Sequence, residues 1–128
     1  MHLGHFKDFK GADAVLLAGS PGEIESLSER LGSLASSGES SIPVHCFASV
    51  APSKSVQLSV LHSVPLARPE PSHFYWLCSS AELADIRAKL AALARLGSGH
   101  QYFNLLGSPT QLVVSVGEYS AAWWQAQA

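Results

Sequence analysis

The strongest constraint on the fold is a similarity between two helical segments that lie at a constant offset along the chain. Ser20 is followed by Glu23, and Ser79 by Glu82, so each predicted helix begins with the residues of a capping box. The same apolar stripe then follows in both: Ile24, Leu27, Leu31 and Leu34 in the first, and Leu83, Ile86, Leu90 and Leu93 in the second. The chain is therefore predicted to contain two related units.

Short apolar segments around each helix predict strands in the same order in both units. The predicted strands cover residues 14–18, 44–49 and 55–63 in the first unit, and 74–78, 101–106 and 110–116 in the second. The closing strands share the pattern Gln-Leu-x-Val, at 57–60 and at 111–114. Each unit thus has the order β-α-β-β, as repeat 1 over about residues 14–63 and repeat 2 over about residues 74–117.

The two units are expected to form a single domain over residues 1–128. A chain of 128 residues fits one domain, and one helix with three strands is too little to bury its own core. We predict an α+β fold in which about six strands form one mainly antiparallel sheet, with both helices packed on one face. A proline-rich connector over 64–73 joins the repeats, a strand near residues 3–9 adds an edge, and 118–128 form a tail.

Composition narrows the function classes. The formal net charge of −2 gives no basic field for nucleic acid, and 47% hydrophobic residues are too many for a disordered chain. No segment approaches the roughly 18 to 20 apolar residues of a membrane span, and the N-terminus lacks the apolar core of a secretory signal. We therefore expect a cytoplasmic protein that binds neither nucleic acid nor membrane.

Alternation along the predicted strands assigns uncharged polar and aromatic side chains to the sheet face away from the helices. This candidate partner-binding face consists of His45, Phe47, Gln57, Ser59, Tyr102, Asn104, Gln111 and Ser115. Interface cores are poor in charge and rich in aromatic residues, which favours a protein partner. The alternative is the ordinary solvated face of an antiparallel sheet.

The C-terminal tail is a second candidate for partner binding, through Glu118, Tyr119, Trp123 and Trp124. In a helical turn the adjacent tryptophans point about 100° apart, so one can anchor the tail while the other stays partly exposed. One interpretation is that both seal the edge of the core. The other is that the tail docks a partner or a second copy of the chain, which would make a homodimer.

Residues that could carry chemistry have structural explanations. Cys46 and Cys78 lie in apolar segments typical of buried free thiols, and a disulfide requires their strands to be neighbours. His45 adjoins Cys46, but neighbours in a strand point to opposite faces and cannot form a dyad. The six histidines show no metal-binding motif. We therefore predict no catalytic residues, no metal and no cofactor, and a protein that is not an enzyme.

Two segments carry a resemblance to a known family. Residues 14–23, which run into an amphipathic helix, and residues 111–119 resemble the small bacterial immunity proteins of polymorphic toxin systems, above all the group named immunity protein 32. The resemblance spans about residues 13–119 and rests on hydrophobicity patterns with few fixed residues. It implies a cytoplasmic antitoxin in bacterial competition, which neutralises a cognate toxin or effector by direct binding. It does not identify the surface.

An alternative function remains open at this point. A duplicated chain could form a homo-oligomeric small-molecule or regulatory binding domain, with two quasi-equivalent pockets supplied by the two units.

Overall fold

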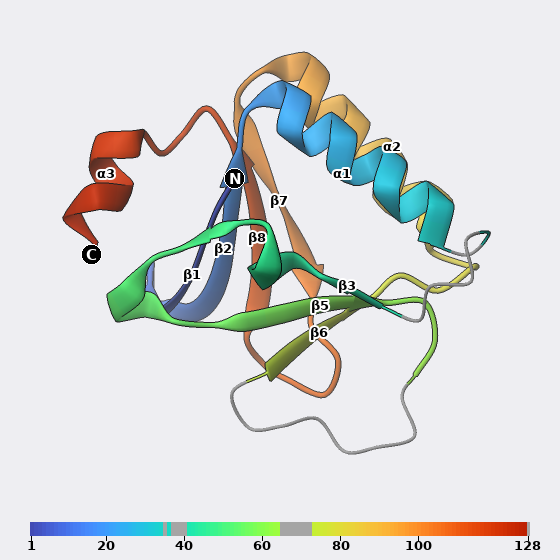
Figure 1. The fold of residues 1–128 in the computed structure, drawn as a ribbon, viewed down its shortest axis with the longest axis horizontal. Coiled ribbons are helices and arrows are strands. Elements are labelled where there is room, and N and C mark those ends of the chain that lie inside the picture. Colours follow the sequence, from blue (N-terminus) through green and yellow to red (C-terminus); the bar gives the residue numbers. More distant parts are fainter. Residues whose placement is uncertain (35, 37–40, 65–72, 128) are drawn as a thin grey trace.

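The computed structural model describes residues 1–34, 36, 41–64 and 73–127. Two helices, α1 (Pro21–Leu34) and α2 (Leu83–Leu96), lie side by side and antiparallel on one side of the strands (Figure 1). Their apolar stripes are buried, as the periodicity predicts: Ile24, Leu27, Leu31 and Leu34 on α1, and Ile86, Leu90 and Leu93 on α2. The α+β class is confirmed.

The strands form two sheets. The larger has the order β4-β1-β2-β8-β7, and the smaller has the order β3-β5-β6. The strand bounds are β1 His2–Phe9, β2 Ala12–Gly19, β3 Ser41–Pro43, β4 Ser49–Val50, β5 Gln57–Leu61, β6 His73–Leu77, β7 Gly99–Asn104 and β8 Gln111–Val116. Each sheet mixes parallel and antiparallel pairs. The prediction of one mainly antiparallel six-stranded sheet is wrong, because alternation assigns side chains to faces but does not decide which strands pair.

The first strand of each unit pairs in parallel with the closing strand of the other unit. Leu17 of β2 lies opposite Val114 of β8, and Trp76 of β6 lies opposite Val60 of β5. These two pairs occupy matching positions in the two units. Neither unit could therefore form its sheet without the other.

The helix pair shows the same reciprocity. Ser28 and Arg87, which are 59 residues apart, bond to each other's backbone: the Ser28 hydroxyl donates to the Arg87 carbonyl, and Arg87 Nε donates to the Ser28 carbonyl at 2.9 Å. The same offset carries Ser20 to Ser79. The two helices thus cross where equivalent residues meet.

One core fills the space between the helices and the two sheets. It joins α1 and α2 to Leu17 and Val114 of the larger sheet and to Leu58 and Trp76 of the smaller one. Trp76 also contacts Phe103 of β7, with ring centroids 4.9 Å apart, so an aromatic pair connects the sheets.

A second, smaller cluster lies on the other face of the larger sheet. Helix α3 (Ala121–Ala126) places Trp124 against Phe6, Leu16 and Val113. The predicted N-terminal strand is present as β1, but it lies inside the sheet because β4 pairs with its outer side. One face of the larger sheet thus packs on the main core, and part of the other is covered by the chain's own C-terminal helix.

The predicted strand over residues 44–49 is wrong. A 3-10 helix, η1 (Val44–Cys46), replaces most of it, and another, η2 (Pro52–Lys54), follows β4. The Val44 carbonyl accepts from the amides of Phe47 and Ala48, which closes a turn. The Leu58 amide then donates to His45 Nδ1 at 3.2 Å. A histidine side chain therefore takes the place that a strand backbone would occupy beside β5.

The two predicted capping boxes have different outcomes. In α1 the Ser20 hydroxyl accepts from the Glu23 amide at 3.2 Å, and the Glu23 carboxylate accepts from the Ser20 amide at 2.9 Å. Helix α2 begins only at Leu83, after Glu82, and no side chain caps it. The capping box of α2 is therefore a wrong prediction.

Candidate functional site

The predicted partner-binding face is divided between the two sheets and the turn before β4. Tyr102, Asn104, Gln111 and Ser115 lie in the larger sheet, and Gln57 and Ser59 in the smaller one. His45 lies in η1, and Phe47 directly follows it. The expected single surface is wrong, because the strands that carry it belong to different sheets.

Three of these residues form a common exposed surface on the larger sheet. Asn104 of β7 lies opposite Gln111 of β8, and Tyr102 lies opposite Val113 on the same face. All three polar side chains are exposed, and Tyr102 retains 53% of its accessible surface. We call Tyr102, Asn104 and Gln111 the β7 surface. It lies at the edge of the sheet, where no described strand pairs with the outer side of β7.

Ser115, on the same face, is buried and bonded within the protein. Its hydroxyl donates to Glu118 Oε1 at 2.6 Å, and His100 Nδ1 lies 3.0 Å from both Glu118 oxygens. Burial by itself would raise the pKa of Glu118, but the hydrogen bonds from Ser115 and His100 outweigh it and hold that pKa below its ordinary value. The serine hydroxyl faces the carboxylate and not the imidazole, so the group ties β8 to β7 and is not arranged as a nucleophile with its base.

The tail residues hold the tail on the sheet. Trp124 is only 4% exposed and stacks on His2, with ring centroids 5.1 Å apart. Trp123 is partly exposed and contacts Phe6 and Tyr119. The Ser120 hydroxyl accepts from the Trp123 amide and caps α3. Of the two interpretations of the tail, this geometry favours the one in which both tryptophans seal the core.

On the smaller sheet only one predicted face residue is open to solvent. Gln57 is exposed, whereas Ser59 is 5% exposed with its hydroxyl 2.9 Å from His73 Nε2. The His73 ring stacks on Tyr75, with centroids 4.3 Å apart. This sheet therefore offers Gln57 alone as a polar residue of the predicted set.

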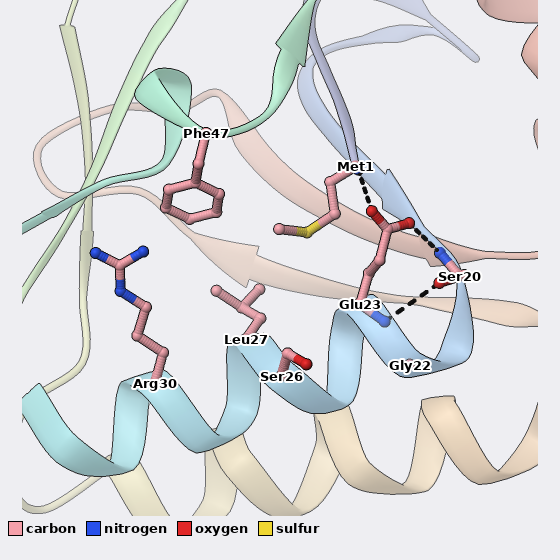
Figure 2. A pocket seen from close by; sticks show the side chains of 8 residues that line it. All are labelled: Met1, Ser20, Gly22, Glu23, Ser26, Leu27, Arg30 and Phe47. Atoms are coloured by element: carbon pink, nitrogen blue, oxygen red, sulfur yellow. Dashed lines mark hydrogen bonds and ion pairs between the residues drawn. The ribbon is translucent and has the colours of Figure 1, made fainter.

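A pocket of about 490 Å³ lies beside α1, as Figure 2 shows. Its lining residues come from the residue before β1, from α1 and the serine that precedes it, and from the turn after η1: Met1, Ser20, Gly22, Glu23, Ser26, Leu27, Arg30 and Phe47. Only Phe47 belonged to the predicted set, and there it was assigned to a strand. Nothing in the helical pattern of α1 distinguishes Arg30 from a residue on a solvated helix face, so the sequence carried no signal for this pocket.

The two cysteines differ in environment. Both are free thiols, but Cys46 is exposed and Cys78 is buried, so the expectation that both are buried is wrong for Cys46. Burial, with a smaller contribution from Glu82, raises the pKa of Cys78 to about 12. Across the described residues, no three His, Cys, Asp or Glu side chains gather into a metal-binding group.

Comparison with protein-family models, with curated proteins and with solved structures finds no match for this chain. No helix within the described ranges is long and apolar enough to cross a membrane.

Proposed function

We propose that this chain is an immunity-type protein that neutralises a cognate bacterial toxin by direct binding, and that the β7 surface is where the toxin binds. The observation that carries the proposal is an exposed, uncharged surface at an open sheet edge. The resemblance of residues 14–23 and 111–119 to immunity proteins supplies the class of partner. In this proposal the protein acts in the cytoplasm, by occluding the toxin and not by catalysis.

The edge of β7 differs from the other sheet edges. β4 has two residues, and β3 has three, the last of them Pro43. The outer side of β6 meets the segment that directly follows β7, since the Leu106 amide donates to the Tyr75 carbonyl at 2.8 Å. β7 has six residues and contains no Lys, Arg, Asp, Glu or Pro, the residues that normally protect an edge from pairing.

An open edge strand presents backbone N–H and C=O groups to a partner. An extended segment of another protein can add to such an edge as a further strand, with affinity from the main chain and specificity from neighbouring side chains. Here Tyr102 and Asn104 are two residues apart on β7 and lie on the same face, and Gln111 extends this surface onto β8. Tyrosine is among the residues most often found as binding hot spots, so Tyr102 is the expected anchor.

The test is co-expression of the chain with the protein encoded by the neighbouring gene, followed by co-purification and measurement of the Kd. Tyr102→Arg places a charge in the β7 surface, and we expect it to raise the Kd about 30-fold or more. Gln57→Arg is the matched control, because Gln57 is exposed on the other sheet; we expect it to change the Kd less than about threefold. Thermal melting of both variants checks that the fold is intact.

Two outcomes would contradict the proposal. If the neighbouring gene encodes no toxin and the chain retains no partner, the immunity role fails. If Gln57→Arg weakens binding as much as Tyr102→Arg does, the toxin is not bound through the β7 surface.

A further inference from the structure

The pocket beside α1 has an apolar middle. Leu27, which is 2% exposed, forms its floor on α1, and the Phe47 ring, 41% exposed, stands over it from the turn after η1. The Met1 side chain points into the same space (Figure 2). A volume of about 490 Å³ is within the usual range for sites that hold small organic molecules.

The charges at the two ends of the pocket differ in how they are satisfied. Glu23 and Arg30 lie two turns apart on α1, with Leu27 between them (Figure 2). The Glu23 carboxylate accepts from the Ser20 amide through one oxygen and from the Met1 amine through the other, so both of its oxygens are occupied. This end of the pocket has no free charge to offer a ligand.

Arg30 is the opposite case. Its guanidinium lies over the Phe47 ring, 4.9 Å from the ring centroid, and among the described residues no carboxylate pairs with it. An arginine stacked on an aromatic ring still presents its N–H groups at the rim and binds carboxylate, sulfonate or phosphate oxygens well. The pocket thus combines apolar walls with a cation that no carboxylate of the described part of the chain neutralises.

We propose that this pocket is a binding site for a small amphipathic organic anion, whose apolar body lies between Phe47, Leu27 and Met1 and whose acidic group meets Arg30. The site lies on α1 and the turn after η1 and does not include the β7 surface. It is therefore independent of the toxin-binding proposal, and either could fail while the other holds.

The test uses two fluorescent probes of similar shape, the anionic 8-anilino-1-naphthalenesulfonate and the neutral N-phenyl-1-naphthylamine. Fluorescence titration of the wild-type chain should show one saturable site for each probe. Phe47→Ser should weaken both probes about tenfold, because it removes the apolar wall. Arg30→Gln should weaken the sulfonate about tenfold and leave the neutral probe within about twofold, because it removes the guanidinium and its charge but leaves the apolar walls in place.

Matched controls lie on α2, where Arg95 and Leu96 are exposed. Arg95→Gln and Leu96→Ser remove the same kinds of group outside the pocket and should change neither titration more than about twofold. Amide chemical shifts, followed by NMR during the sulfonate titration, should move around residues 22–30 and 47 in the wild type. The inference is overturned if Phe47→Ser leaves both probes unaffected, if the α2 variants match the pocket variants, or if Arg30→Gln weakens both probes equally.

Discussion

The two units have the same order of elements, but the strand that follows the helix differs between them in length and surroundings. In the second unit this strand is β7, which is six residues long and lies at the sheet edge. In the first unit it is β3, which stops at Pro43 after three residues and gives way to η1. Beyond η1, Phe47 lies over α1 and forms one wall of the pocket. The same order of elements thus produces an open sheet edge in the second unit and one wall of a pocket in the first.

The difference shows where two related units can diverge without loss of the shared fold. The strands that exchange between units keep matching pairs, Leu17 with Val114 and Trp76 with Val60. The outer strands, β3 and β7, each place one residue in the main core, whereas the exchanged strands β5 and β8 place two and three, so more positions of the outer strands are free to change. Binding surfaces in this molecule are therefore expected on the outer strands, and stability is expected to depend on the exchanged ones.

The largest expected effect tests whether the exchanged strands form one cooperative core. Trp76→Ala should lower the free energy of unfolding by about 3–5 kcal/mol, and the equivalent Leu17→Ala by about 2–5 kcal/mol, because both side chains are fully buried. Urea unfolding followed by circular dichroism and by tryptophan fluorescence should give one coincident transition in each variant. Two separate transitions would show that the units fold independently.

The sequence predicted the helices and the inward faces of most strands well, because burial leaves a periodic signal along the chain. It did not predict the division into two sheets. β2 pairs with β8, and β5 with β6, but the residue types in these strands do not show which strand lies beside which. The turn over η1 was missed for a similar reason. The His45 side chain accepts a hydrogen bond from the Leu58 amide. This bond replaces one that a strand backbone would make to β5, and no local sequence pattern predicts it.

The candidate site was predicted in part. Alternation along β7 and β8 correctly placed Tyr102, Asn104 and Gln111 on one exposed face. It could not show that Ser115, on the same face, would be buried and bonded to Glu118. The pocket depends on a residue of α1 meeting a turn distant in sequence, and such meetings follow from the tertiary fold alone.

A smaller effect compares the starts of the two helices. Ser20→Ala removes a hydroxyl that accepts from the Glu23 amide, so it should lower the free energy of unfolding by about 1 kcal/mol. Ser79→Ala should change it by less than about 0.5 kcal/mol, because α2 begins at Leu83 without a side-chain cap. Thermal or urea unfolding of the two variants measures the difference. Equal losses would mean that the capping box predicted from Ser79 and Glu82 does form in solution.

The smallest expected effect concerns Glu118 of the second unit, because the shared Gln-Leu-x-Val pattern of the closing strands puts the apolar Val64 at the equivalent position of the first unit. The pKa of folded Glu118 lies below its ordinary value of 4.5, so ionised Glu118 favours the folded state. This stabilisation is complete above the unfolded pKa and disappears as the pH falls through the lower folded pKa. Glu118→Gln should therefore lower the Tm slightly at pH 7, and the difference from the wild type should shrink as the pH falls below 4.5 and vanish once the folded carboxylate is protonated. A difference that is unchanged or larger at acid pH would show that the carboxylate's charge is not what ties β8 to β7.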